Sequence, residues 1–392
     1  MLKKRKIIAE REEELPISTI GELIKIAEES KGVVSLGPGE PDFTSPRHVI
    51  DFACKKLRGG YTHYSPPAGR SELLEAIAKK LRKENKIDVS PEQIIVTTGS
   101  TEAILLALMC TIDPGEGVLI PDPGFLAYRP TVEILNGMPL SIPHRENDGF
   151  QFKIENAEEV IIPEKTNVLI INSPSNPTGC VYTKKTLEEI ADFAIEYDLL
   201  IISDEAYEKF VYGNERHISI GSLNGMGEHV LTLQSFSKTY AMPGFRIGYA
   251  AGPEKIINAM KKIHIYSTIC SPTISQEAAL AALRGNQNCI KKMVKEYDKR
   301  RKFMVKRLNE ISGFSCIEPK GAFYTFPNIK VFKMNSFEFS MWLLKNAKVS
   351  VVPGTEFGKF GEGYIRCSFA TSYKKIVEAL DRIERAIKKL KI

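Results

Sequence analysis

The sequence predicts an α/β fold, in which helices cover a mostly parallel β-sheet, together with a smaller α+β domain. The first observation is that short apolar runs of strand length recur through the middle of the chain. The second is that segments with a helical spacing of apolar residues separate these runs. Strands that are apolar throughout are buried on both faces, which is typical of parallel sheets between layers of helices. The apolar runs lie at residues 93–97, 117–120, 167–171, 199–202, 230–234 and 247–251.

The alternation of strands and helices does not continue to the C-terminus. Long charged helices are predicted there at 290–308 and 373–390, and they flank shorter strand-like runs. We therefore expect an N-terminal arm with part of the small domain over residues 1–47, a large ligand-binding domain over 48–280, and a small C-terminal domain over 281–392. The remaining predicted elements are helices at 17–29, from about 71, at 102–109 and at 187–197, and short strands near 322–326, 349–352 and 364–368.

The composition is that of an ordinary globular protein. Of the 392 residues, 43% are hydrophobic and 26% are charged, and the formal net charge is +6. The basic residues are dispersed, so the sequence carries no footprint of a nucleic-acid-binding surface. The N-terminus has no apolar signal core and no apolar run approaches membrane-spanning length, so we expect a cytoplasmic protein.

Cysteine and histidine spacing gives no support for disulfides or for a metal site. The seven cysteines are odd in number and scattered, with no Cys-x-x-Cys pair, which favours buried free thiols in a reducing compartment. The six histidines include no His-x-x-x-His or His-Glu-x-x-His spacing, so no metal ligand is predicted.

The segment from Ser235 to Tyr240 follows the apolar run 230–234 and carries the most distinctive candidate residue, Lys238. Hydroxyl residues flank this lysine, and Arg246 follows after a short loop. A lysine amine near hydroxyls and a guanidinium suits a Schiff base to an aldehyde cofactor that also carries a phosphate. Because most lysines are solvated surface residues, this interpretation depends on the other strand-end loops.

Three further loops follow predicted strands, where the ligands of parallel sheets bind. Ser100 and Thr101 open a helix whose free amides can cradle a phosphate, although an ordinary helix N-cap is the structural alternative. Phe125 can lie on a heteroaromatic ring, although most phenylalanines fill the core. Asn176 lies in a turn rich in Asn and Pro and can offer its amide to a phenolic or carboxylate oxygen.

Asp204 and Tyr207 follow the fourth apolar run. A carboxylate at the end of a buried strand is costly unless it is paired, and a protonated pyridine nitrogen is a suitable partner. Tyr207 is placed to donate a hydrogen bond to an oxygen of the same ring. The structural alternative is an aspartate in an internal salt bridge.

Taken in order, these segments resemble the class I/II aminotransferase family of pyridoxal-phosphate enzymes of fold type I. The segments that carry the resemblance are Asn176–Gly179, Asp204–Tyr207, Ser235–Lys238 with Arg246, and Tyr364–Arg366. They stand in the family's order and approximate spacing, and the resemblance covers nearly the whole chain. It implies a seven-stranded sheet, pyridoxal 5'-phosphate as the cofactor, and a homodimer with shared active sites.

The resemblance also implies a role for each candidate residue. Lys238 would form the Schiff base and move the proton, Asp204 would bind the pyridine nitrogen, and Tyr207 with Asn176 would contact the ring oxygen, while Phe125 stacks on the ring. The phosphate would be held by Ser100, Thr101, Ser235 and Arg246, with Tyr64 reaching the cofactor of the neighbouring subunit. The substrate would be bound by Gly39, Asn176, Arg366 and Ile20, of which Arg366 grips the α-carboxylate.

The implied function is transfer of the α-amino group of an amino acid to a 2-oxo acid, with 2-oxoglutarate as the expected acceptor. Some aspartate-specific relatives have a lysine where Thr101 stands, so the donor stays open among aspartate, alanine and aromatic amino acids. Two alternatives remain. One is C–S lysis or cyclopropane-forming (ACC-synthase-like) chemistry on the same fold. The other is a non-enzymatic pyridoxal-phosphate-binding regulator, for whose usual DNA-binding module the chain has no spare segment.

Overall fold

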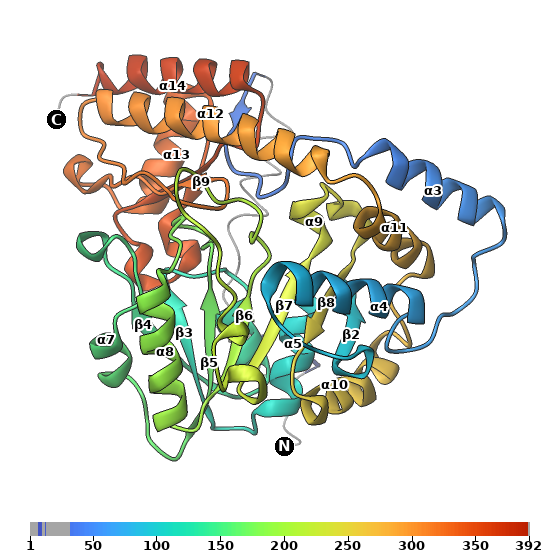
Figure 1. Cartoon of the computed structure of the whole chain (residues 1–392). Coiled ribbons are helices and arrows are strands. Elements are labelled where there is room, and N and C mark those ends of the chain that lie inside the picture. The colour runs from blue at the N-terminus through green and yellow to red at the C-terminus, as the bar shows by residue number, and fades with distance from the viewer. Residues whose placement is uncertain (1–6, 10–11, 13–31, 391–392) are drawn as a thin grey trace, which may run out of the picture.

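A seven-stranded sheet forms the centre of the computed structural model, which describes residues 7–9, 12 and 32–390 (Figure 1). The strands lie in the order β2–β8–β7–β6–β5–β3–β4. Strand β8 runs antiparallel to both of its neighbours, and the other pairs in this sheet are parallel. The predicted mostly parallel α/β class is therefore confirmed. The strands are β2 (Ile94–Thr97), β3 (Gly117–Asp122), β4 (Met138–Pro143), β5 (Thr166–Asn172), β6 (Leu200–Asp204), β7 (Val230–Ser235) and β8 (Gly248–Ala251).

All six apolar runs predicted as strands lie in this sheet, whereas β4 was not among the predicted elements. It pairs only with β3 and occupies the edge of the sheet. Its first three residues are half-buried, and it contains Pro139 and Pro143. Proline is tolerated at a sheet edge, where one side of the strand needs no ladder hydrogen bonds. An edge strand therefore lacks the continuous apolar run by which the inner strands can be recognised.

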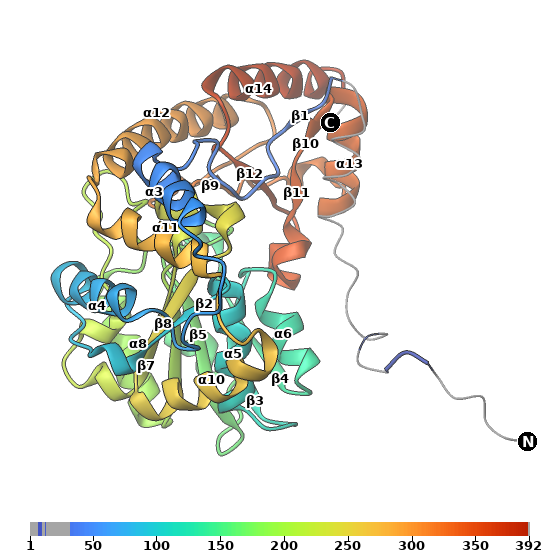
Figure 2. The ribbon, with the colours of Figure 1, turned by 90° about the vertical axis from the view of Figure 1, so that its right-hand side faces the viewer.

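Helices cover both faces of the sheet (Figures 1 and 2). Successive residues of β2 show the two faces, because Ile95 packs with the α5 side while Ile94 and Val96 pack with the α4 side. The first face carries α5 (Ser100–Thr111), α6 (Tyr128–Ile134) and α10 (Glu254–Ser267). The second carries α4 (Ser71–Lys80), α7 (Ile154–Glu158), α8 (Lys184–Glu196) and α11 (Thr273–Arg284), with α3 (Arg47–Arg58) against α11.

Residues 288–390, here named the C-terminal unit, form a second layer above the sheet (Figure 2). They contain α12 (Asn288–Glu310), α13 (Ser336–Ala347) and α14 (Tyr373–Ile387), around a three-stranded sheet in the order β11–β12–β9. The apolar spacing of Ile376, Leu380 and Ile383 along α14 explains its burial against this unit. The strands are β9 (Tyr324–Thr325), β10 (Val349–Ser350), β11 (Val352–Pro353) and β12 (Ile365–Ser368).

The chain just after the predicted arm joins this unit. Strand β1 (Val34–Ser35) pairs in parallel with β10, so residues far apart in sequence lie side by side (Figure 2). The division at 1–47, 48–280 and 281–392 stays a prediction. The predicted arm helix at 17–29, together with Ile20, lies outside the described residues.

Two expectations from composition can be compared with the described residues. All seven cysteines are free thiols, as predicted, but the expected burial holds only for Cys180, Cys316 and Cys367. Of the other four, Cys54 is exposed and Cys110, Cys270 and Cys289 are half-buried. Within the described part of the chain, no helix combines the length and the apolar character that crossing a membrane requires.

Candidate active site

A cavity of about 220 Å³ lies between the carboxyl ends of the central strands and the C-terminal unit. Parallel strands end at the same edge of their sheet, which explains why loops distant in sequence meet there. Apart from Tyr64 and Ile20, every site residue predicted from the sequence lines this one cavity. These residues are Gly39, Ser100, Thr101, Phe125, Asn176, Asp204, Tyr207, Ser235, Lys238, Arg246 and Arg366.

Two predicted residues are not part of the cavity. Tyr64 does not line it, and its side chain is 79% exposed. A contact of Tyr64 with a neighbouring subunit therefore stays a prediction. Ile20 lies among the residues that the structure does not describe.

Lys238 is held by a short helix that begins where β7 ends. This helix is α9 (Phe236–Thr239), and the Ser235 hydroxyl caps it by accepting a hydrogen bond from the Ser237 amide. The Lys238 Nζ atom donates to the Gly39 carbonyl oxygen at 2.5 Å. Burial, and then the positive charge of Arg366, lowers the pKa of Lys238 from 10.5 to about 8. A substantial fraction of this amine is therefore neutral and nucleophilic near pH 8.

Asp204 ends β6, the strand beside β7, and its side chain is buried. One carboxylate oxygen accepts a hydrogen bond from the Tyr128 hydroxyl at 2.8 Å, and the other accepts from the Ala206 amide at 3.1 Å. Burial raises the pKa of Asp204, and these two donors oppose that rise. A cationic partner in the cavity would stabilise the carboxylate further.

Tyr128 is a functional candidate to which sequence reasoning gave no role. It begins α6, is almost fully buried, and its ring meets that of Phe125 edge to face with centroids 5.5 Å apart. It therefore supports both the cavity acid and the predicted stacking ring. The only signal in the sequence was its place three residues after Phe125, at the end of the same loop.

Tyr207 meets a second tyrosine that sequence reasoning also missed. The hydroxyl groups of Tyr207 and Tyr324 lie 2.6 Å apart, and Tyr324 comes from β9 of the C-terminal unit. Burial, and then the neighbouring Tyr324, raises the pKa of the Tyr207 phenol well above its ordinary value. The phenol therefore stays protonated and can donate a hydrogen bond to a ligand.

Arg366 lies in β12 with its guanidinium buried between two aromatic rings. The ring centroids of Tyr324 and Phe357 lie 4.4 and 4.8 Å from the guanidinium carbon. Its terminal nitrogens donate to the Asn176 side-chain oxygen at 2.9 Å and to the Gly37 carbonyl at 2.7 Å. These partners are neutral, and the Nε atom has no hydrogen-bond partner among the described residues. A buried guanidinium of this kind suits the bidentate capture of a carboxylate.

The start of α5 faces the guanidinium of Arg246. Gly99 precedes this helix with φ +85°, and a Cβ atom placed there would come within 2.8 Å of Arg246 Nη2. The first amides of a helix have no partner within the helix, and the dipole there favours an anion. The Thr98 hydroxyl nearby is buried and has no hydrogen-bond partner within the described part of the chain. The glycine keeps open a cradle bounded by helix amides, hydroxyls and a cation.

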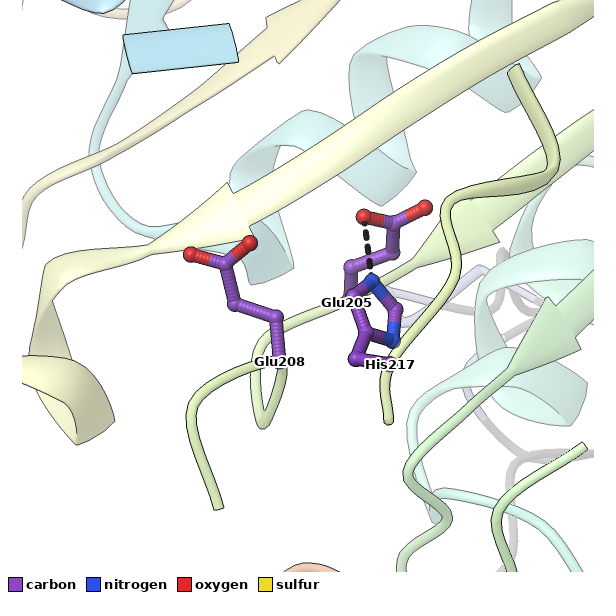
Figure 3. A group of neighbouring side chains, drawn as sticks. All are labelled: Glu205, Glu208 and His217. Carbon is purple, nitrogen blue, oxygen red and sulfur yellow. Dashed lines mark hydrogen bonds and ion pairs between the residues drawn. The ribbon is translucent and has the colours of Figure 1, made fainter. Parts of the chain in front are cut away.

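A second polar cluster lies on the other side of the same strand ends. Figure 3 shows the His217 imidazole beside the Glu205 carboxylate, with Glu208 along the same segment. The His217 Nε2 atom lies 2.9 Å from Glu205 Oε2. Possible ligand atoms of these three residues lie within 4.8 Å of one another. Their carboxylates are already engaged, however. Glu208 forms an ion pair with Lys80, and Glu205 accepts from Ser219 at 2.7 Å.

The partners of this cluster make it an interior polar network. Asn85 and Gln234 each donate side-chain hydrogen bonds to both Glu205 and Glu208. Although burial opposes ionisation, the charges of Lys80 and Lys209 lower the pKa of Glu208 well below its ordinary value. The Lys80 ammonium group thus already compensates the charge of Glu208.

The cavity of about 220 Å³ thus combines Lys238, whose pKa is lowered, the buried acid Asp204 on the neighbouring strand, and the guanidinium groups of Arg246 and Arg366. That combination at the strand ends of an α/β sheet is typical of enzymes that bind a phosphorylated aldehyde cofactor. The sequence model of the aminotransferase class I and II family matches residues 31–383. The chain belongs to this family and is an enzyme that transfers amino groups.

Individual relatives agree with this assignment. An aspartate aminotransferase of Pyrococcus abyssi is 48% identical over 96% of this chain and 97% of the relative. An aromatic-amino-acid aminotransferase 2 of Thermococcus litoralis is 46% identical over 98% of this chain and 99% of the relative. The crystal structure of an aromatic aminotransferase from Pyrococcus horikoshii has a TM-score of 0.89 and 47% identity, covering 94% and 99% of the two chains.

Proposed function

We propose that the protein is a pyridoxal 5'-phosphate-dependent transaminase in which Lys238 is the reactive amine. The observation that carries the proposal is that Lys238, Asp204 and Arg366 line one cavity although they come from three separate elements. Each offers what one participant in the reaction needs: an amine for an aldehyde, an acid for a pyridine nitrogen, and a guanidinium for a carboxylate.

The residues of the cavity fit this cofactor. The cradle between the start of α5 and Arg246 suits a phosphate, because a side chain at Gly99 would fill it. Ser100, Thr101 and Ser235 line the cavity beside this cradle with their hydroxyls. Asp204 would hold the pyridine nitrogen, and the Tyr207 phenol and the Asn176 amide would face the ring oxygen. The Phe125 ring lines the same cavity and would lie against the cofactor ring.

The residues of this chain divide the work of proton transfer and orientation. When bound, the cofactor withdraws electrons from the substrate's α-carbon, which makes the proton there acidic. With a pKa of about 8, the Lys238 Nζ atom can accept that proton and return it near neutral pH. Arg366 fixes the α-carboxylate, and thereby the direction in which the proton leaves. Burial of Asp204 and Tyr207 excludes water from the far side of the cavity.

We further propose that the donor carries an aromatic side chain. Among the described residues that line the cavity, the cations are Lys238, Arg246 and Arg366, and each already has a role at the cofactor or the α-carboxylate. A second substrate carboxylate would therefore meet no further cation of these residues. The Thermococcus litoralis relative is named for aromatic amino acids, whereas the Pyrococcus abyssi relative is named for aspartate. The choice of 2-oxoglutarate as the acceptor rests on family resemblance.

The active form that we propose is a homodimer. Tyr64 and Tyr266 are 79% and 91% exposed, which is unusual for large aromatic side chains. Tyr64 lies in a loop whose His63 carbonyl accepts from Thr273 of α11. Tyr266, at the end of α10, leads into a loop in which Thr268 donates to Glu102 in the first turn of α5. A second copy covering these loops would bury both rings next to the cofactor cradle.

Replacing Lys238 tests the proposal. Lys238→Ala should reduce amino-group transfer to background and abolish the visible absorbance that the protein retains after mixing with the cofactor and desalting. Lys262→Ala, at an exposed lysine, is the matched control and should change neither signal. Turnover by the Lys238→Ala protein would refute the assignment.

A donor panel tests the substrate. Phenylalanine, tyrosine, aspartate and alanine would be compared at equal concentration, each with 2-oxoglutarate as the acceptor. We expect a higher kcat/KM for the aromatic donors than for aspartate. A preference for aspartate would contradict the proposed donor class while leaving the proposed chemistry intact.

A further inference from the structure

Asp122 ties the end of β3 to a loop of the C-terminal unit, residues 354–361. One carboxylate oxygen accepts from the Phe360 amide at 2.9 Å, and the other accepts from the Lys359 amide at 3.2 Å. The second oxygen also accepts from the Ser141 hydroxyl at 2.9 Å. Asp122 is 1% exposed, so these bonds replace nearly all of its hydration. Burying a carboxylate costs solvation free energy, which the two loop amides, the Ser141 hydroxyl and the nearby charge of Arg129 offset.

The loop is shaped to receive this carboxylate. Gly358 has φ +122°, a conformation that favours glycine, and a Cβ atom there would lie 2.2 Å from Asp122 Oδ1. A cavity of about 250 Å³ lies beside the contact, lined in part by Asp122, Phe357 and Gly358. The loop is therefore fastened at its Asp122 end both by hydrogen bonds and by the close approach of Gly358 to the carboxylate.

The same loop supports the guanidinium that would bind the substrate. Phe357 lies one residue before Gly358, and its ring lies 4.8 Å from the guanidinium carbon of Arg366. The Phe357 carbonyl accepts from the Gly124 amide at 2.8 Å, which fixes the backbone directly before Phe125. Asp122, Gly124 and Phe125 belong to one short stretch, so a single segment anchors both the loop and the predicted stacking ring.

We infer that Asp122 is a positioning residue for the substrate carboxylate. By holding the amides of residues 359 and 360, it keeps Phe357 against the Arg366 guanidinium, and so fixes the angle at which that guanidinium meets a carboxylate. Asp122 itself does not line the cavity in which Lys238 and Arg366 lie. The inference rests on the carboxylate-binding role proposed for Arg366.

The main test is Asp122→Asn, which keeps the shape of the side chain but turns one acceptor into a donor that faces an amide. We expect KM to rise about tenfold for both the amino acid and the 2-oxo acid, with a much smaller change in kcat, as expected when substrate and transition state lose the same interaction. Calorimetric titration with 3-phenylpropionate, an unreactive carboxylate, should show a Kd raised by a similar factor, with and without the cofactor.

Two companion variants make the outcome decisive. Ser141→Ala removes a partner of the same carboxylate but leaves both loop amides in place, so KM and Kd should stay within about twofold of the parent. Arg366→Lys tests the underlying role, because lysine cannot bind a carboxylate in the same bidentate geometry.

Three results separate the possibilities. If Arg366→Lys leaves KM and Kd unchanged, the proposed carboxylate site is wrong. If it raises both while Asp122→Asn leaves them unchanged, only the positioning role of Asp122 is overturned. If Asp122→Asn lowers the melting temperature and the kcat of the sample with no change in Kd, Asp122 has only a structural role, which also overturns the inference.

Discussion

Asp204 and Glu205 are neighbours in sequence, yet they serve two regions of opposite character. The Asp204 side chain lines the cavity and has one hydroxyl and one amide as partners. Glu205 points into the interior network, where Ser203, Ser219, His217, Asn85 and Gln234 all contact its carboxylate. A buried charge with few partners can be stabilised further by a ligand. A buried charge whose hydrogen-bonding capacity is already filled within the protein contributes instead to the stability of the fold.

The lysines of the two regions differ in the same way. The Lys80 ammonium is paired with Glu208, so its charge is compensated within the protein. Lys238 donates to a carbonyl, and burial and the charge of Arg366 lower its pKa to about 8. Burial alone therefore does not identify a reactive group. What distinguishes Lys238 is that it forms no direct ion pair with an acid among the described residues, and this difference can be tested by altering one region at a time.

The largest expected effect is on stability, in the interior network. Lys80→Met leaves the buried Glu208 carboxylate without its main counter-charge, which should lower the free energy of unfolding by about 3–5 kcal/mol. Lys79→Met, at the exposed neighbour, is the matched control and should change stability little. Chemical denaturation measures both. A loss below about 1 kcal/mol for Lys80→Met would mean that the two regions do not differ as described.

The next effect is on catalysis, at the neighbouring pair of acids. Asp204→Asn removes the negative charge from the cavity and should lower kcat about 10²–10³-fold while leaving the protein folded. Glu205→Gln should instead lower the melting temperature and keep kcat within a few-fold. Steady-state kinetics together with thermal denaturation distinguish the two variants. Similar losses of kcat in both variants would mean that Asp204 and Glu205 do not differ in function as described.

A third prediction concerns the pH at which each lysine reacts. Only the neutral amine is a nucleophile, so a pKa lowered from 10.5 to about 8 should bring Lys238 into reaction at lower pH than an ordinary lysine. In protein without cofactor, the rate of trinitrophenylation at Lys238 should rise through pH 8, as followed by peptide mass spectrometry. Exposed Lys262 is the internal control, and a Lys238 rate that follows the same pH dependence as Lys262 would contradict the prediction.

The smallest effect is expected at the hydroxyl that supports the cavity acid. Tyr128→Phe removes the hydrogen bond to Asp204 and should lower kcat/KM about tenfold. Because that bond favours the carboxylate, its loss should raise the pKa of Asp204, so activity should fall off at a higher pH on the acid side of the profile. Tyr197→Phe, at a partly exposed tyrosine, should change neither. An unshifted acid limb would show that Tyr128 does not act through Asp204.

Local pattern was enough to predict much of this molecule. The inner strands are apolar throughout because both of their faces are buried, so runs such as 230–234 could be recognised from sequence. The residues directly after those runs, including Asp204 and Lys238, were placed at strand ends by the same reasoning. Tyr128 and Tyr324 were given no role, because the groups with which they share hydrogen bonds, Asp204 and Tyr207, lie 76 and 117 residues away in the sequence. Phe357 was given none because it reaches Arg366 from a loop between β11 and β12.

The amino-acid sequence by itself determined the order of the strands and helices, the identity of the groups at the strand ends, and the family to which the chain belongs. Only the tertiary structure decided that Asp204 faces a cavity while Glu205 faces a saturated network, and that the Lys238 amine donates to a carbonyl near the positive charge of Arg366. The physical reason is that side-chain periodicity fixes which residues alternate between faces, whereas the partners that set a charge's energy come from distant parts of the chain.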